Sequence, residues 1–212
     1  MRLQDIVLED RFNALIIPKI TVTVLANLVA AFRIGFRLWW IKWPGADDVL
    51  VGFAAVANTA YVVTYLQLVR YSLKIHADFS LFPIFQKFLF AAIVTYVVAN
   101  TAVKFSILAQ TRRIFVQPGA QRATLIIIVY LALYSTAIFL VCIMTCIPVE
   151  KYWHSAMPGR CLDRILIHYV FAIINIFNDV IILITPMIFI KDLQVSRLTK
   201  LGITALFACG GL

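Results

Sequence analysis

Charged residues are scarce in this chain of 212 residues, since Asp, Glu, Lys and Arg together make up only 14%. A soluble domain carries about 25% charged residues, and a disordered chain combines low hydrophobicity with high net charge, so both classes are excluded. The chain also has only 8 glycines, 7 prolines and 4 cysteines, which excludes a collagen-like protein and a small disulfide-held scaffold. What remains is a protein with several membrane-spanning segments.

Apolar residues take the place of the missing charges. They make up 63% of the chain, with 16 Phe, 8 Tyr and 4 Trp, and the mean hydropathy is +0.94. The formal net charge is +9, but most basic residues flank apolar runs, where they anchor helices at a membrane surface. There is no basic block with interleaved aromatic residues and no nucleic-acid-binding motif. We therefore expect the lipid bilayer, and not a nucleic acid, as the partner of these charges.

Six apolar runs predict six membrane helices. A spanning helix needs about 20 mostly apolar residues; five runs reach that length, and the sixth is cut short by the end of the sequence. We expect an all-α, polytopic transmembrane bundle over residues 14–212, truncated within helix 6, behind an extracellular N-terminus over residues 1–13. The expected helices run from about Ala14 to Phe36, Asp48 to Val69, Ile84 to Ile114, Ala123 to Ile147, Ile165 to Ile190 and, incompletely, Leu198 to Leu212.

A pair of cysteines indicates the orientation, which the nearly equal numbers of basic residues on the two sides do not decide. Cys146 and Cys161 flank the loop after the fourth expected helix, and a disulfide between them would stabilise the loop by about 3 kcal/mol. Such a bond requires an oxidising compartment, so this loop and the N-terminus would both lie outside. Two unpaired cysteines remain the alternative. Cys142 and Cys209 are expected within helices, and no Cys/His cluster has the spacing of a metal site.

Polar residues inside two expected helices form a predicted interior network. His168, Asn175 and Asp179 share one helix face, and Asn100 and Lys104 are four residues apart on another helix. If the two helices are neighbours, Lys104 can pair with Asp179, the one acid deep in a span. Such a pair could fix the helix register, or it could form a site for a ligand, a proton or an ion. The residues leave both possibilities open.

A second group of charges lies at the inner ends of the first two helices. Asp47 and Asp48 open the second helix, where acidic side chains satisfy backbone N–H groups and favour the helix dipole. Arg33 and Arg37, one turn apart at the end of the first helix, are their expected ion-pair partners. No histidine lies near a candidate nucleophile and no phosphate-binding glycine loop is present, so we expect no enzymatic activity.

The ordered motifs of the chain resemble the fungal rhodopsin-domain family of integral membrane proteins, which includes receptor-like surface proteins tied to plant infection. The motifs that carry the resemblance are Arg33 and Arg37, Asp47-Asp48, His76, Lys104 in KFSIL, Arg113-Ile114-Phe115, CIPVEKYW with a downstream GRC (Cys146, Pro148, Trp153, Gly159, Cys161), NIFNDVIILITP (Asn175, Asp179, Pro186), Lys200, and Phe207 to Gly210.

This resemblance implies a seven-helix, rhodopsin-like receptor with an outer N-terminus and a Cys pair around the outer loop between helices 4 and 5. It does not imply a retinal cofactor, because the Schiff-base lysine normally lies in helix 7, and Lys104 is not a substitute for it. No cofactor is expected.

The leading hypothesis is a receptor-like sensor in the plasma membrane with an unknown extracellular ligand. The ligand would shift a bundle equilibrium. A cytosolic partner would detect the shift at inner basic residues, namely Arg112, Arg113, Lys191, Arg197 and Lys200. The alternatives are a transporter or channel with an Asp/Lys/Asn path, and a non-functional fragment.

Overall fold

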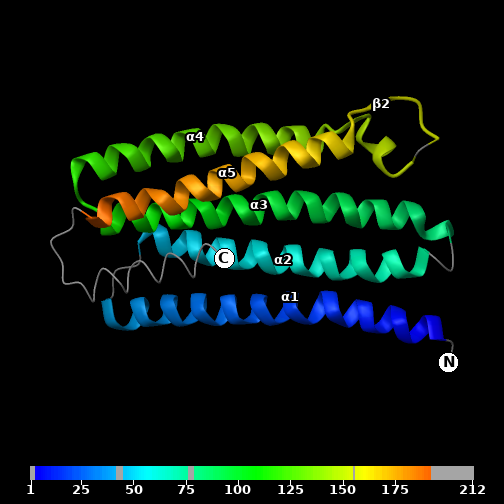
Figure 1. Ribbon diagram of the computed structural model, residues 1–212, viewed down its shortest axis with the longest axis horizontal. Helices are drawn as coiled ribbons and strands as arrows, with labels where there is room; N and C mark the ends of the chain where they lie inside the picture. Colours follow the sequence, from blue (N-terminus) through cyan, green and yellow to red (C-terminus); the bar gives the residue numbers. More distant parts are fainter. Residues whose placement is uncertain (1–2, 42–44, 76–78, 155, 192–212) are drawn as a thin grey trace. The chain divides into compact units, whose positions relative to one another are not determined.

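Five long helices make up most of the computed structural model, which describes residues 3–41, 45–75, 79–154 and 156–191. They are α1 (Leu3–Phe36), α2 (Ala46–Ile75), α3 (Phe82–Ile114), α4 (Pro118–Ile143) and α5 (Arg164–Lys191), as Figure 1 shows. A π-helical turn, η1 (Arg37–Ile41), continues α1, and the 3-10 turn η2 (Phe79–Leu81) leads into α3.

Each of the five helices is long and apolar enough to cross a membrane. The candidate spans are Ile16–Trp39, Ala46–Ser72, Phe79–Ile114, Pro118–Ile143 and Arg164–Phe189. Most of their large apolar side chains are exposed, as expected where lipid and not water surrounds a helix. These spans confirm the all-α transmembrane fold class. The sixth expected helix, from Leu198 to Leu212, lies outside the described residues, as do His76 and Cys209.

The limits of α4 differ from the expectation at both ends. The helix begins at Pro118, because a proline in the first helical turn lacks only an N–H that would have no helical partner. It ends at Ile143, so the expected end at Ile147 is wrong. The Thr145 hydroxyl donates to the carbonyl oxygens of Val141 and Cys142, both at 2.9 Å, which satisfies acceptors at the end of the helix.

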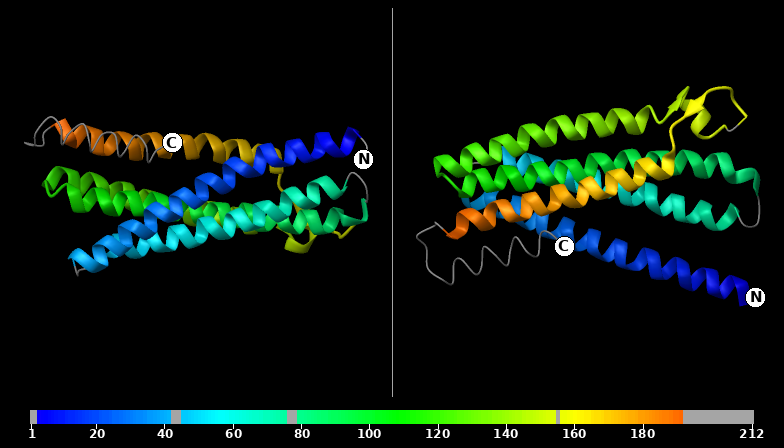
Figure 2. Two further views of the ribbon diagram at one scale, coloured as in Figure 1. Left: turned by 90° about the horizontal axis from the view of Figure 1, so that it is seen from below. Right: turned by 45° about the horizontal axis from the view of Figure 1, so that its top comes forward.

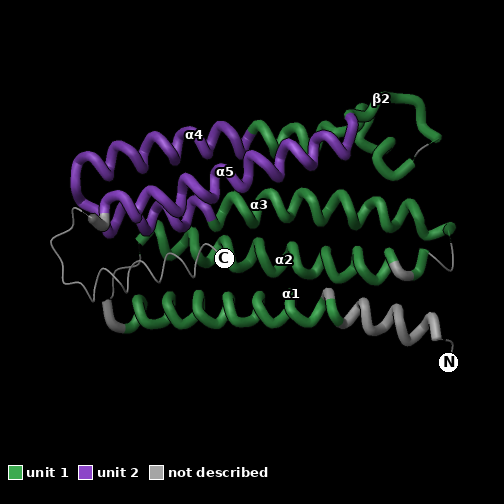
Figure 3. The backbone as a smooth tube through the Cα atoms, viewed as in Figure 1, with its two compact units in different colours: residues 1–103, 137–162 green, residues 104–136, 163–212 purple. Residues whose placement is uncertain are grey.

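The chain divides into two compact units, shown in Figure 3. Unit 1 contains residues 1–103 and 137–162, and unit 2 contains residues 104–136 and 163–212, so α3 and α4 contribute to both. In unit 1, α1 and α2 run in opposite directions and contact each other, as the views of Figure 2 also show. The Asn27 amide donates to the Thr59 hydroxyl at 3.0 Å, and the hydroxyls of Thr64 and Thr95 link α2 to α3 at the same distance.

Unit 2 is held by apolar contacts between α5 and the parts of α3 and α4 within this unit. One buried cluster joins Leu108, Leu131 and Ile182. A second cluster joins Phe115 and Ala120, and the ring of Phe189 packs against it. Within unit 2, α3, α4 and α5 therefore meet through small apolar clusters.

A short hairpin closes the loop between α4 and α5 in unit 1. The strands β1 (Cys146–Ile147) and β2 (Arg160–Cys161) are antiparallel, with Cys146 opposite Cys161, and the 3-10 turn η3 (Val149–Tyr152) lies between them. Cys146 and Cys161 form a disulfide, which confirms the expected pair. Gly159 has φ +157°, and a Cβ atom there would meet the Ile147 carbonyl oxygen at 2.5 Å, so this position requires glycine.

Candidate functional site

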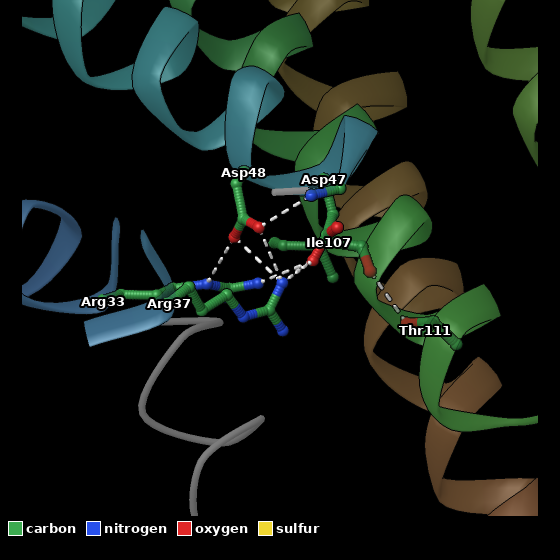
Figure 4. Close-up of polar contacts among 7 residues, drawn as sticks. Arg33, Arg37, Asp47, Asp48, Ile107 and Thr111 are labelled. Carbon is green, nitrogen blue, oxygen red and sulfur yellow. Dashed lines mark hydrogen bonds and ion pairs between the residues drawn. The ribbon is translucent and has the colours of Figure 1, made fainter. Parts of the chain in front are cut away.

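A four-residue ionic cluster lies in unit 1, where α1 ends and α2 begins (Figure 4). Arg33 and Arg37 are one helical turn apart, and their guanidinium groups reach Asp47 and Asp48 in the first turn of α2. Arg33 lies 3.2 Å from Asp47, while Arg37 contacts Asp47 and lies 2.9 Å from Asp48. The backbone N–H of Gly45 also donates to Asp48 at 3.1 Å, which fixes the turn before α2.

The four members of this cluster that the structure describes are two acidic and two basic residues. The side chains of Asp47 and Asp48 are only 4% and 6% exposed, whereas those of Arg33 and Arg37 are 25% and 20% exposed. Two buried carboxylates therefore face two guanidinium groups, with the positive end of the α2 dipole beside them. The geometry suits a clasp that holds α1 against α2.

A second ionic group lies in unit 2, inside the spans. Lys104 of α3 donates to the side-chain oxygen of Asn175 on α5, and its ammonium lies 3.1 Å from the Asp179 carboxylate. The Asn175 amide donates to Asp179 at 3.3 Å, which joins the three side chains. The Lys104 side chain is 4% exposed and that of Asp179 is 51% exposed. A buried cation thus depends on a carboxylate whose other side is open.

Asn178 lies one residue before Asp179 but faces a different group. It is 2% exposed and accepts a hydrogen bond from the Tyr130 hydroxyl of α4 at 3.1 Å. Its amide nitrogen has no hydrogen-bond partner among the described residues. Tyr130 stacks on Tyr134, with ring centroids 6.1 Å apart. This amide gives unit 2 a polar link between α4 and α5, in addition to the one between α3 and α5.

The predicted interior network is only partly present. Within unit 2 the structure brings together Lys104, Asn175 and Asp179. His168 does not contact them: it is exposed among the described residues, and its Nδ1 lies 2.5 Å from the carbonyl oxygen of Arg164. His168 lies seven residues before Asn175 on α5; His168 is exposed, whereas Asn175 is half-buried. Asn100 is half-buried in unit 1.

One further ionic feature, in unit 1, was not predicted from the sequence. Lys19 of α1 lies over the rings of Tyr61 and Tyr65 of α2, with its Nζ 4.6 and 5.7 Å from the ring centroids. A lysine inside a predicted span was the available signal. Among the described residues there is no group of three His, Cys, Asp or Glu side chains that could hold a metal ion. Cys142 is free and buried.

Five apolar spans, with ionic groups paired inside or at the ends of the helices, define a polytopic α-helical membrane protein. The profile of the Fungal rhodopsin domain matches residues 32–212. The chain belongs to this family, as the motif order had suggested.

Three curated relatives are similar to parts of the chain. An SAT4 family membrane protein of Emericella nidulans is 41% identical over 80 residues, which cover 38% of this chain and 21% of the relative. Wortmanamides biosynthesis cluster protein C of Talaromyces wortmannii is 28% identical over 183 residues, covering 84% and 48%. Satratoxin biosynthesis SC1 cluster protein 4 of Stachybotrys chartarum is 30% identical over 117 residues, covering 54% and 44%. The chain spans less than half the length of these relatives, and no solved structure matches it significantly.

Proposed function

We propose that this protein is a receptor-like sensor of extracellular signals without enzymatic activity. It would act in the plasma membrane with its N-terminus outside. The observation that carries the proposal is the contact of buried Lys104 with Asn175 and half-exposed Asp179. If the half-exposed Asp179 can leave this contact, the helices have two arrangements, one with the ion pair formed and one with it broken. A sensor needs two such arrangements, because a ligand acts by favouring one of them.

The asymmetry of the pair suggests how the switch works. Lys104 stays enclosed in both arrangements, because little of its side chain is exposed. Asp179 can turn towards a ligand or a proton on its open side, while Asn175 keeps a hydrogen bond to the ammonium. A ligand shifts the equilibrium only as far as it binds one arrangement better than the other.

The turn between α3 and α4 in unit 2 is the proposed binding place for a cytosolic signalling partner. Arg112 is eight residues after Lys104 on α3, about 12 Å along the helix. Its Nε donates to Gln121 of α4 at 3.0 Å, so it lies at the turn between α3 and α4. A rotation of α3 against α5 would move this turn, and a cytosolic signalling partner would bind there and at the neighbouring Arg113.

The test is a transcript profile of a fungal host that expresses the wild type or a variant, with surface delivery measured by biotinylation. We expect Lys104→Met and Asp179→Asn each to change ligand-independent expression of the responding genes about tenfold or more, because each releases the contact. The exchange Lys104→Asp with Asp179→Lys restores the pair and should restore the response. Lys74→Met removes an exposed charge in the last turn of α2, in unit 1, and serves as the control. Unchanged profiles for surface-delivered single variants would overturn the proposal.

A transporter or channel is the second candidate, because the open side of Asp179 also suits a passing ion or proton. Proteoliposomes that hold the purified chain separate the two functions. A proton or cation flux that disappears in Asp179→Asn would replace the sensor by a transporter, whereas no flux above empty vesicles agrees with the sensor.

A further inference from the structure

The turn between α3 and α4 carries positive charge that no described acidic residue balances. Arg112 and Arg113 lie in the last turn of α3, and Arg122 lies near the start of α4. Residues 104–136, the stretch of unit 2 that contains this turn, include no Asp or Glu. Residues 191–200 of the sequence hold three basic residues and one acidic residue, so their composition does not reverse the balance.

The described part of α5 brings no acidic side chain to this turn either. Phe189 of α5 packs against Phe115 and Ala120, which flank the turn. Asp179 lies ten residues before Phe189, about 15 Å along the helix, and its carboxylate already contacts Lys104. The guanidinium groups at the turn are therefore left without a described carboxylate.

Gln121 of α4 fixes the turn and holds Arg112. Its side-chain oxygen accepts a hydrogen bond from the Arg112 Nε at 3.0 Å, and its amide nitrogen donates to the carbonyl oxygens of Arg112 and Phe115 at 2.5 and 2.6 Å. These bonds tie the start of α4 to the end of α3. They use only the Nε of the guanidinium, and its two terminal nitrogens have no partner among the described residues.

The neighbouring charges are exposed at the membrane surface. Arg122 follows Gln121 in the chain, is exposed, and has no hydrogen bond or ion pair with a described residue, while Arg113 is exposed as well. The spans of α3 and α4 end at Ile114 and begin at Pro118, so the turn lies where two spans meet the lipid headgroups. Long basic side chains at this depth extend towards the headgroups.

We propose that the turn between α3 and α4 binds an anionic phospholipid whose headgroup carries a phosphate monoester. Guanidinium groups donate in pairs to phosphate oxygens, and Arg112 and Arg122 supply two such groups. A phosphate monoester carries a charge of about −1.5 to −2 at neutral pH, which balances two guanidinium groups. The position between two spans favours a lipid over a soluble phosphate. This inference does not depend on the proposed signalling role, because a headgroup can bind whether or not a cytosolic partner also uses the turn.

The experiment is native mass spectrometry of the purified full chain in detergent micelles, titrated with phosphatidylinositol phosphate or with phosphatidylinositol. The two lipids differ only in the phosphate monoester. We expect the monoester lipid to form about fivefold more adduct, and Arg112→Met and Arg122→Met each to lower it to the level of phosphatidylinositol. Arg70→Met is the matched control and should change nothing, since Arg70 is an exposed arginine of α2 in unit 1.

A further variant tests the geometry and keeps the charge. Gln121→Leu retains all three arginines but releases Arg112, so it should lose most of the preference for the monoester lipid, while the thermal midpoint reports that the variant folds. Equal binding of the two lipids, unchanged binding in both arginine variants, or full preference in Gln121→Leu would each overturn the proposal. Phosphatidylserine that binds as well as the monoester lipid would show attraction to surface charge alone. Equally tight binding of the free inositol bisphosphate headgroup would identify a soluble phosphate as the ligand and overturn the lipid assignment.

Discussion

The ionic groups of the two units are built in opposite ways. In unit 1 the carboxylates of Asp47 and Asp48 are buried and the arginines are partly exposed, whereas in unit 2 Lys104 is buried and Asp179 is half exposed. The cluster in unit 1 holds two charges of each sign, and the group in unit 2 holds one of each with an amide between them. A cluster with buried, multiply paired carboxylates suits a fixed clasp, and a pair with a half-exposed carboxylate suits a contact that can be exchanged.

The polar links of the two units also differ in how far apart the linked residues are in the sequence. Arg33 and Asp47 are 14 residues apart and the disulfide joins residues 15 apart, so the polar links of unit 1 connect neighbouring elements. Lys104 and Asn175 are 71 residues apart, and Tyr130 and Asn178 are 48 apart. The ionic cluster and the disulfide of unit 1 are therefore local constraints, while the ionic group and the amide link of unit 2 join distant segments. The predictions below test this difference.

The largest effect is expected in unit 2 when the buried cation loses its carboxylate. Asp179→Leu should lower the free energy of unfolding by about 3–4 kcal/mol, the lower part of the range for a broken buried pair, because Asp179 is half exposed. Unfolding by sodium dodecyl sulfate in bicelles measures this value. Lys104→Met should cost less, since Asp179 keeps the Asn175 amide as a donor. The double variant should regain most of the loss, and a double variant as unstable as Asp179→Leu would contradict the pairing.

The next effect belongs to unit 1. Replacing Cys146 and Cys161 by serine should lower stability by about 3 kcal/mol, because the bond closes a loop of about 15 residues. Hydrogen exchange should rise in the loop and in β1 and β2, and remain unchanged around Leu108 and Ile182 in unit 2. Equal loss of protection in both units would show that the constraint is not local.

A smaller loss is expected from the clasp. Arg37→Met removes the guanidinium that Asp47 and Asp48 share and should cost about 2 kcal/mol, because Arg33 still compensates part of the buried negative charge. Arg37→Lys should recover only part of the loss, since an ammonium lacks the planar fork of donors. Thermal unfolding followed by tryptophan fluorescence measures both variants, and a full recovery by lysine would contradict the shared geometry.

The smallest effect is expected at the amide link of unit 2. Tyr130→Phe removes one hydrogen bond to Asn178 and should cost about 1 kcal/mol. Tyr169→Phe is the control, because it removes the same hydroxyl from an exposed tyrosine of α5 in the same unit. An equal or larger loss for Tyr169→Phe would show that the hydrogen bond to Asn178 is not the stabilising contact.

Sequence reasoning predicted the features that depend on composition or on short spacing. The five spans follow from apolar length, and the contacts of Arg33 and Arg37 with Asp47 and Asp48 follow from the order of helix end and helix start. The disulfide between Cys146 and Cys161 was expected because the two cysteines flank a short loop. These features need no knowledge of which distant helices are neighbours.

The features that were missed depend on that knowledge. Periodicity placed His168 on the face of Asn175, but the structure leaves this end of α5 exposed. The hydrogen bond that the Tyr130 hydroxyl of α4 donates to Asn178 on α5 was also not predicted. Lys19 was overlooked because its partners are aromatic rings on α2 and not acidic residues. A sequence shows that a residue is charged, but it does not show which aromatic rings of another helix contact that charge.

The position of Gly159 has a practical consequence for protein engineering. The paired strands and the disulfide hold both ends of the loop, and the Ile147 carbonyl oxygen leaves no room for a side chain at position 159. The exposed stretch around Ala156 and Pro158 lies within this frame. An epitope grafted after Ala156 should therefore be displayed without disturbing the helices, whereas one that replaces Gly159 should not. The loop is a ready attachment point for antibodies or fiducial domains in electron cryomicroscopy.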